Sequence, residues 1–301
     1  MTTSTDLDPP RPLELSPALS CFPTRTPTLL PATHTNSYAL GSRDVLLVEP
    51  ATPYEDERRE WLAWARGLQS QGRNLVGIFL THHHVDHTGG ADFFAAELGL
   101  PKWAHPITAS LLQPGASRGT ATASIDRELL DGETIILDGP EAESWAVLHT
   151  PGHAPGHLCL FNGSTGDLVC GDMVASIGTI IIEPVDGDMM LYIEQLQRLL
   201  DLNASRALPA HGAAINDPSR FFAHYIAHRL KRELKVLDAL HAVGDSGGVA
   251  KDLVPHAYDD TPEALWHLAE LSVQTHLIKL EQDGRATRDG ERYFRLPGGS
   301  P

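Results

Sequence analysis

The sequence predicts an α/β fold, in which a layered domain of sheets and helices is followed by a small helical module with a β-wing. Short apolar runs typical of buried strands recur in both halves of residues 28–218, and helical patterns separate them. Histidine and aspartate residues follow several of these runs, beside Gly or Pro. Two long helical patterns and a pair of short apolar runs occupy residues 219–301. We therefore expect two domains, a catalytic domain at 28–218 and a winged-helix-like domain at 219–301.

The N-terminal residues 1–27 are rich in Pro, Ser and Thr, which predicts a flexible tail. The apolar runs 38–40 and 45–48 are separated by Gly41 and three polar residues, which indicates a β-hairpin. Residues 55–71 have the apolar spacing of a helix. A buried strand is expected over 75–80, and a helix over 90–98.

The second half of the catalytic domain has strand-like runs at 134–137, 145–149, 158–161 and 168–170, followed by an amphipathic helical pattern over 189–201. A long helix is expected over 221–242. The next helix is expected to begin after Thr261, a good N-cap, with Pro262 in its first turn, and to end near Leu280. Two short runs, at Ala286 and at 293–296, complete the pattern of a winged helix.

The bulk composition is that of a soluble globular protein, with 42% hydrophobic and 21% charged residues. The net charge of −16 disfavours a nucleic-acid partner. No apolar run is long enough to span a bilayer, and the N-terminus lacks the basic and apolar pattern of a leader, so we expect a cytoplasmic protein with no membrane partner. Three cysteines, Cys21, Cys159 and Cys170, do not suit a disulfide framework.

Four potential metal ligands stand within six residues directly after the strand at 75–80: His82, His84, Asp86 and His87. Imidazole and carboxylate groups suit zinc and similar divalent ions. His82 and His84 alternate, so they point the same way in an extended chain and can share one ion, which leaves Asp86 and His87 for a second. Further ligands at later strand ends disfavour the alternative of a solvated, His-rich loop; they are His153, Asp172 and His211.

These motifs resemble those of the metallo-β-lactamase superfamily, whose signature H-x-H-x-D-H is followed by His, Asp and His motifs in the same order. The resemblance covers residues 35–212 and implies a four-layer αββα sandwich. It implies that one metal is bound by His82, His84 and His153, that a second is bound by Asp86, His87 and His211, and that Asp172 bridges them. The chain departs from the family pattern at Glu49, where the family often has Asp.

The resemblance also implies the chemistry of a binuclear metal-dependent hydrolase. Two divalent ions, zinc by preference and iron or manganese as alternatives, lie about 3.5–4 Å apart and share a hydroxide that is nucleophilic at neutral pH. In this family pattern Asp86 orients the hydroxide and returns a proton to the leaving group.

Several other residues are weaker candidates. His83 lies between two ligands and is expected to point away from them, and His149 and His157 are expected to be structural. Cys170 is expected to face the core rather than a metal. His224 and His228 are four residues apart on a predicted helix, but no carboxylate pattern accompanies them.

Residues 172–211, the segment 225–229 and the C-terminal region resemble the β-lactamase-like protein 2 subgroup. The subgroup resemblance implies that His228 and Arg229 contact the substrate. The predicted second helix of the wing module, 261–280, has Lys279 as its single Lys or Arg, and residues 221–301 hold 10 Lys and Arg against 12 Asp and Glu. A nucleic-acid-reading winged helix is usually basic, so we expect packing or a homodimer contact instead.

The fold predicts the reaction better than the substrate. We expect hydrolysis of a small-molecule ester, thioester or lactone. The main alternative is an endoribonuclease that cleaves single-stranded RNA, and β-lactam hydrolysis is another. A redox protein with an iron pair and a flavin partner is disfavoured because that branch commonly has Glu at the position of His84. The intact ligand set disfavours a non-catalytic scaffold.

Overall fold

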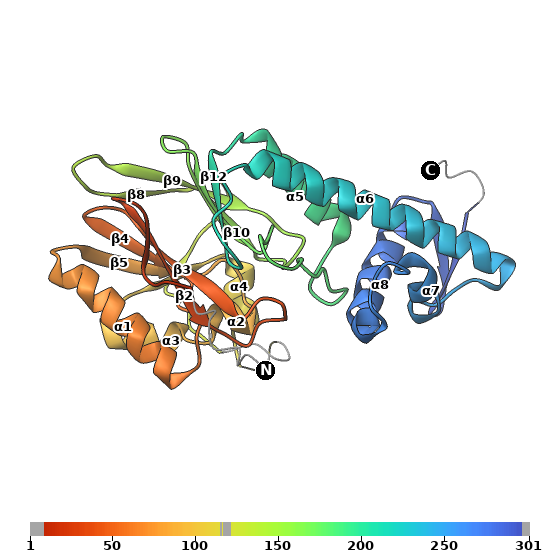
Figure 1. The fold of residues 1–301 in the computed structure, drawn as a ribbon, viewed down its shortest axis with the longest axis horizontal. Helices are drawn as coiled ribbons and strands as arrows, with labels where there is room; N and C mark the ends of the chain where they lie inside the picture. Colours follow the sequence, from red (N-terminus) through yellow and green to blue (C-terminus); the bar gives the residue numbers. More distant parts are fainter. Residues whose placement is uncertain (1–8, 115, 117–121, 297–301) are drawn as a thin grey trace, which may run out of the picture. The chain divides into compact units, whose positions relative to one another are not determined.

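The computed structural model describes residues 9–114, 116 and 122–296, and Figure 1 traces their fold. The chain forms two compact units. The first comprises the residues up to 149 together with 156–178 and 205–216, and the second comprises 150–155, 179–204 and the chain from 217 onward. The second unit therefore includes two segments, 150–155 and 179–204, that lie within the catalytic domain expected from the sequence.

The first sheet has seven strands that lie side by side in chain order. Neighbouring strands are antiparallel from β1 to β4 and parallel from β4 to β7. The predicted hairpin at 38–48 is confirmed as the β3–β4 pair. The strands are β1 (Leu13–Ser16), β2 (Leu19–Arg25), β3 (His34–Leu40), β4 (Asp44–Val48), β5 (Asn74–Phe79), β6 (Lys102–Ala104) and β7 (Arg127–Glu128).

Strands β1 and β2 correct the expectation of a flexible tail over residues 1–27. β2 pairs with β3 along its whole length, and Phe22 stacks on Trp64 with 5.1 Å between the ring centres. The buried carboxylate of Glu57 accepts hydrogen bonds from Arg11 at 2.5 Å and from Nε of Arg25 at 2.8 Å. Ser20, Pro23 and Thr24, which contributed to the expectation of a tail, are buried residues of β2, and residues 1–8 of the expected tail lie outside the described chain.

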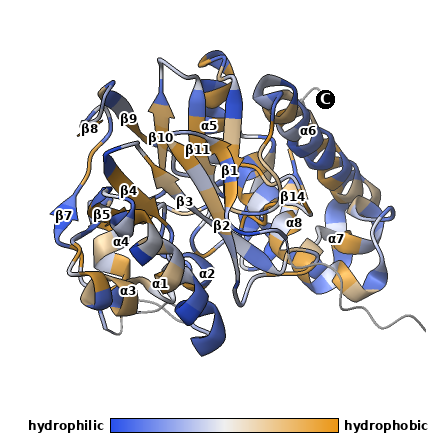
Figure 2. Cartoon of the chain, turned by 60° about the vertical axis from the view of Figure 1, so that its left-hand side comes forward, coloured by the Kyte–Doolittle hydropathy of each residue, from blue (hydrophilic) through white to orange (hydrophobic). Residues whose placement is uncertain are grey.

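Helices cover one face of the first sheet, and their apolar faces form a core with it (Figure 1). Trp61 of α1 and Phe94 of α3 are fully buried there and lie 4.2 Å apart between ring centres, against Leu47 and Ile78 of the sheet. Figure 2 shows the predominantly hydrophobic residues of β4 in this sheet. The helices of this core are α1 (Glu55–Ser70) and α3 (Ala91–Leu98), and the unit also contains the short helices α2 (Val85–Thr88) and α4 (Pro106–Leu111).

The second sheet has five strands in the order β12-β11-β10-β9-β8, antiparallel except for the β11–β12 pair. Its inner side chains, such as Val147 and Leu160, share a core with Tyr38 and Phe79 of the first sheet. The predicted α/β fold with two facing sheets is thus confirmed. The strands are β8 (Thr134–Leu137), β9 (Glu143–His149), β10 (Leu158–Asn162), β11 (Asp167–Gly171) and β12 (Arg206–Pro209).

The second unit is mainly helical and ends in the predicted two-stranded wing. Its last long helix begins at Trp266 instead of directly after Thr261, because residues Glu263–Leu265 form a separate 3-10 turn. None of the described helices is long and apolar enough to cross a membrane. The elements are α5 (Met189–Asp201), α6 (Pro218–Val243), α7 (Ala250–Ala257), α8 (Trp266–Gln282), β13 (Ala286–Asp289) and β14 (Arg292–Arg295), with 3-10 turns at Gly244–Ser246 and Glu263–Leu265.

We predict that Glu57→Gln lowers the free energy of unfolding by about 2 kcal/mol, because it leaves the partly buried Arg11 with a weaker partner. Hydrogen bonds from Arg11 and Arg25 outweigh burial and lower the pKa of Glu57 below its ordinary value of 4.5. The stabilisation is therefore present above pH 4.5 and lost as the pH falls through the lowered pKa.

Urea unfolding of Glu55→Gln is the matched control, because its pair with Arg59 on the same helix is exposed. That variant is expected to change the free energy of unfolding by less than about 0.5 kcal/mol. Equal losses in the two variants would show that Glu57 does not anchor the N-terminal strands.

Candidate metal centre

The histidine-rich segment lies where β5 ends and the short helix α2 begins. His82 and His84 precede the helix in an extended connection, while Asp86 and His87 belong to its single turn. The Oγ1 atom of Thr88 donates to the carbonyl of His84 at 2.9 Å, which holds the end of the connection. A buried strand on one side and a helical turn on the other therefore present all four side chains from a rigid base.

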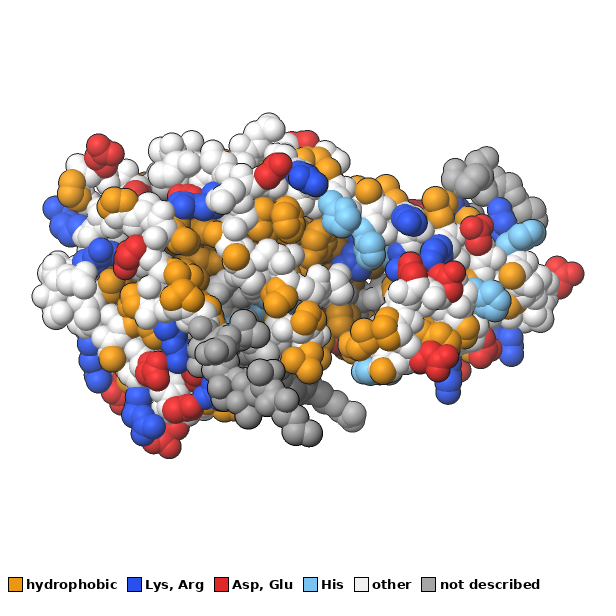
Figure 3. Space-filling model, viewed as in Figure 1, with side chains coloured by type: hydrophobic (Ala, Val, Ile, Leu, Met, Phe, Trp, Pro, Cys, Tyr) orange, Lys and Arg blue, Asp and Glu red, His pale blue; other side chains and the backbone are white. Residues whose placement is uncertain are grey.

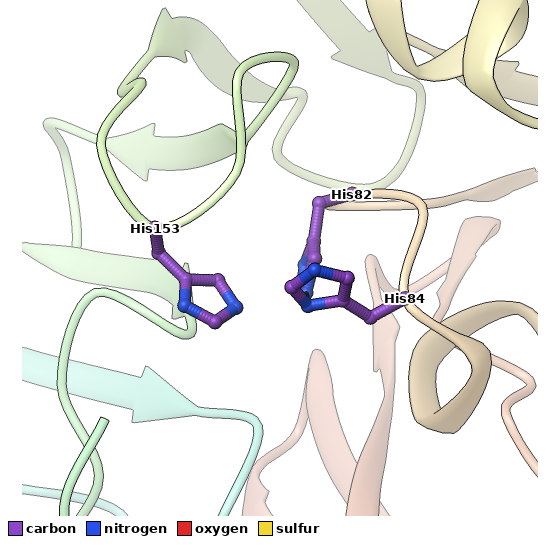
Figure 4. Close-up of side chains that lie close together, drawn as sticks. All are labelled: His82, His84 and His153. Atoms are coloured by element: carbon purple, nitrogen blue, oxygen red, sulfur yellow. Dashed lines mark hydrogen bonds between the residues drawn. The ribbon is translucent and has the colours of Figure 1, made fainter. Parts of the chain in front are cut away.

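A first group of ligand atoms comes from His82, His84 and His153, and these atoms lie within 4.8 Å of one another. Figure 4 shows the His153 ring pointing toward those of His82 and His84. The Nε2 atom of His82 and the Nδ1 atom of His84 are 2.9 Å apart. These are the three residues that the sequence assigns to one metal.

A second group contains Asp86, His87 and His211, whose ligand atoms also lie within 4.8 Å of one another. The carboxylate of Asp172 lies beside this group. Its Oδ2 atom is 3.5 Å from Nε2 of His87, and its Oδ1 atom is 3.4 Å from Nε2 of His211. The structure thus brings together the ligands assigned to the second metal, and the bridging role of Asp172 toward the first metal stays a prediction.

The second group fits a divalent cation by its geometry. The separations between its imidazole nitrogens and carboxylate oxygens range from 3.4 to 3.8 Å, longer than ordinary hydrogen bonds. Ligands placed tetrahedrally around a zinc ion at its usual bond lengths are separated by about 3.3 Å. The buried Nε2 atom of His87 makes no hydrogen bond in the described part of the chain, as expected of an atom reserved for a metal.

Three of the imidazoles are held by a contact of one ring nitrogen, Nδ1. The Nδ1 atom of His87 lies 2.9 Å from Oε1 of Glu49, that of His211 lies 2.9 Å from the carbonyl of His34, and that of His153 lies 2.9 Å from the carbonyl of Ile181. Because a carbonyl or carboxylate oxygen accepts, each Nδ1 must carry the proton. Each Nε2 is then left with the lone pair that a metal requires.

Glu49 has a larger part than its position in the sequence indicates. Besides contacting His87, its carboxylate accepts a hydrogen bond from Oγ1 of Thr81. The Oγ1 atom of Thr81 in turn lies 2.9 Å from Nδ1 of His82. One buried carboxylate therefore orients His87 of the second group directly and His82 of the first group through Thr81. The only signal in the sequence is its place after a buried strand, and a glutamate there can be recognised as an orienting group only once the fold is known.

His157 supports Asp172 from the backbone. Its Nε2 atom accepts a hydrogen bond from the Asp172 amide at 3.1 Å. Gly171 has a φ of +47°, and a Cβ there would lie 2.5 Å from the same nitrogen. A glycine is therefore required at 171 so that the chain can turn Asp172 toward the histidines.

The electrostatic field of the second group favours a cation. Burial lowers the pKa of His87, but the carboxylates of Glu49, Asp172 and Asp86 outweigh burial and raise that pKa well above its ordinary value. Burial raises the pKa of Asp172, yet the imidazoles of His211 and His87 hold it well below its ordinary range. Positive charge is strongly stabilised at this point of the protein.

The weaker candidates lie apart from the two groups or face other partners. His83 is fully buried and belongs to neither group, although its ligand atom lies within 4.8 Å of those of His84 and Asp186. The ring of His149 stacks on that of His105 at 4.1 Å. Cys170 is buried, and burial raises the pKa of its thiol, so it is a neutral core residue. Within the described chain, His224 and His228 belong to no metal-ligand group.

The two residues expected to contact substrate are neighbours on α6 but differ in environment. His228 is exposed. Arg229 is 3% exposed, its guanidinium donates to the carbonyl of Ile180, and it lies 5.4 Å from the centre of the Tyr192 ring. Contact of either residue with a substrate stays a prediction.

Comparison with known proteins agrees with this geometry. The sequence model of the Metallo-beta-lactamase superfamily matches residues 30–211, more than half of the chain. The chain belongs to the metallo-beta-lactamase superfamily. The model of the Beta-lactamase associated winged helix domain matches residues 250–295, so this metallo-beta-lactamase superfamily protein carries the predicted winged helix.

Curated relatives match along most of the chain. The Beta-lactamase-like protein 2 homolog of Drosophila melanogaster is 30% identical over 90% of this chain and 91% of its own. The Atrochrysone carboxyl ACP thioesterase of Aspergillus chevalieri is 27% identical, over 88% of this chain and 79% of its own.

Solved structures share the fold. The metallo-beta-lactamase family protein TTHA1429 from Thermus thermophilus has a TM-score of 0.73 and 27% identity, covering 94% of this chain and all of its own. TTHA1623, solved in a di-iron-bound form, has a TM-score of 0.51 and 27% identity, covering 66% of this chain and 96% of its own. With the family shown and its ligand set intact, the protein is a binuclear metal-dependent hydrolase.

We predict that His153→Ala and His211→Ala each lower the bound metal from two ions per chain to one, because each removes a ligand from one group only. Elemental analysis of the purified, dialysed proteins measures this. His83→Asn is the control, since His83 lies in the same loop but in neither group, and it should keep both ions. Loss of an ion from the control would contradict the assignment of the two groups.

Proposed function

We propose that this metallo-beta-lactamase superfamily protein hydrolyses a small-molecule thioester, with esters and lactones as chemically related substrates. The main support is the pair of ligand groups, because carbonyl hydrolysis needs what such groups assemble: an activated water and an electrophilic contact for the carbonyl oxygen. A relative named as an acyl carrier protein thioesterase, aligned over 88% of this chain, favours thioesters within that class.

Two bound divalent ions supply the activated water and polarise the carbonyl. The chain itself supplies the proton transfer through Asp86, whose side chain is 17% exposed and so reaches solvent. Its Oδ1 lies 3.8 Å from Nε2 of His87 and its Oδ2 lies 3.6 Å from Nε2 of His211. A carboxylate held at that place can take a proton from the attacking water and give it to the leaving thiolate or alkoxide.

Exposed apolar side chains lie in the two segments whose backbone contacts His211, and they favour an apolar acyl group in the substrate. Leu29 and Leu30 are exposed in the loop that leads to His34, whose carbonyl holds His211. Ile177 is also exposed, and the neighbouring amide of Ser176 donates to the His211 carbonyl at 3.2 Å. Exposed apolar residues in segments that adjoin a site are candidates for contact with an apolar part of a ligand.

RNA is the second candidate, and the charges of the winged helix weigh against it. Lys279, the single Lys or Arg of α8, lies 2.8 Å from Glu233 and 2.6 Å from Asp283, so its charge is neutralised within the chain. Figure 3 shows Lys and Arg interspersed with Asp and Glu on the face it displays. Phosphate backbones bind to surfaces with clustered basic residues, so this module is better suited to packing or to a homodimer contact.

Zinc is the metal we propose, because a set of imidazoles with few carboxylates and no thiolate suits it. Iron is the alternative, since the related TTHA1623 has been solved in a di-iron-bound form. Manganese is less suited to a site so rich in histidine. Elemental analysis of the purified protein identifies the metal in the same measurement that counts the ions.

We predict that the metal-loaded protein hydrolyses short acyl thioesters, and that Asp86→Asn lowers kcat by about 10²- to 10⁴-fold, because it removes both the proton-transfer group and a carboxylate of the second ligand group. Thiol release measures turnover of the thioesters, and lactones, a chromogenic cephalosporin and labelled single-stranded RNA complete the panel. Asp138→Asn, which changes an exposed aspartate in the first unit, is the control and should leave kcat unchanged. Cleavage of RNA that Asp86→Asn abolishes, with no acyl substrate turned over, would replace this proposal with the ribonuclease.

A further inference from the structure

Three successive backbone carbonyls, at residues 180–182, each accept a hydrogen bond from a different side chain. The carbonyl of residue 180 accepts from the guanidinium of Arg229 on α6. The next carbonyl accepts from Nδ1 of His153 at 2.9 Å. The third lies 3.1 Å from Oγ1 of Thr275 on α8, whose single proton is shared with the carbonyls of Ser272 at 3.0 Å and Leu271 at 3.3 Å. A predicted metal ligand is therefore hydrogen-bonded to a segment that two C-terminal helices hold on either side.

The segment 180–182 has no regular secondary structure of its own, so no sheet ladder fixes its carbonyl groups. Side-chain donors from outside must define where these oxygens lie. Both donors are well suited to that task. Arg229 is buried against the Tyr192 ring, and Thr275 is 2% exposed within α8.

The loop that carries His153 is fixed on its other side by α5. The amide of Asp188, the N-cap of α5, donates to the carbonyl of Gly152 at 2.8 Å. Gly152 has a φ of +138°, and a Cβ there would lie 2.3 Å from Cα of Tyr192. The backbone at Gly152 is therefore held close to α5, and the carbonyl of residue 181 accepts from the imidazole of His153.

We propose that Arg229 and Thr275 are positioning residues for the metal ligand His153, acting through the carbonyl groups of residues 180–182. Loss of either donor releases a carbonyl next to the one that accepts from Nδ1 of His153. The ring then loses a fixed partner, and its Nε2 atom is no longer held in one direction. Outer partners of metal-binding histidines typically change metal affinity by about 10- to 100-fold, which sets the size of the expected effect.

A neighbouring arginine provides a matched control. Arg232 is also buried on α6, lies 4.0 Å from the centre of the Tyr258 ring and donates to a backbone carbonyl, that of Ala257 at the end of α7. It differs from Arg229 in donating to α7 and to Asp260, at 2.9 Å, and not to residues 180–182. Loss of stability from removing a buried arginine should therefore appear when either Arg229 or Arg232 is replaced. An effect on His153 should appear only when Arg229 is replaced.

The experiment measures two quantities for Arg229→Gln, Thr275→Val and Arg232→Gln. Zn²⁺ titration of the metal-free proteins against a competing chelator gives the two metal affinities, and urea unfolding of the same metal-free proteins gives their stability. Arg229→Gln and Thr275→Val are expected to weaken one of the two affinities by about tenfold or more and to leave the other unchanged. Arg229→Lys, which keeps a donor, should restore part of the loss.

Arg232→Gln is expected to lower stability while leaving both metal affinities unchanged. Unchanged affinities in Thr275→Val, a change of little more than one oxygen atom, would overturn the proposal even if Arg229→Gln does not fold. Equal losses of affinity in Arg229→Gln and Arg232→Gln would also overturn it, by assigning the effect to general destabilisation. No substrate enters these measurements, so their outcome is independent of the thioester proposal.

Discussion

The convergence of several potential ligands at one buried point is the constraint on which the structure depends. Carboxylates of Asp86 and Asp172 and the imidazoles of five histidines approach one another below the surface, where water screens them poorly. A bound cation stabilises such a group, because it offsets the carboxylate charges and accepts the imidazole lone pairs. Most of the remaining structure keeps these side chains from turning away from that arrangement, since a freely rotating ligand would find water instead.

The orienting partners come from separate parts of the chain. Glu49 follows β4 and holds His87, the carbonyl of His34 at the start of β3 holds His211, and the carbonyl of Ile181 holds His153. Two of the three are backbone atoms, whose position depends on the path of the chain and not on the residue type. A substitution at His34 or Ile181 can therefore keep the carbonyl in place, whereas a small displacement of the backbone would move it.

Local patterns in the sequence predicted much of this protein. The ligands of each group could be found because they stand at strand ends in short motifs, and α5 was predicted at its observed bounds because Leu196 and Leu199 lie on one apolar face. The N-terminal strands were missed because the Ser and Thr residues of β2 are buried by pairing that no local pattern encodes. The contacts of Glu49 and Arg229 were missed for the same reason: they join positions far apart in sequence.

The spread of the ligands along the chain, from His82 to His211, links the stability of the fold to the supply of metal. An unfolded chain does not bring these separated ligands together, so an ion binds the native state by preference and shifts the folding equilibrium toward it. An ion whose free concentration is about a thousand times its dissociation constant adds about 4 kcal/mol to the free energy of unfolding. That amount is comparable with the whole stability of a small domain. In a cell short of metal, this protein would lose abundance together with activity, because the empty form is the better substrate for proteases.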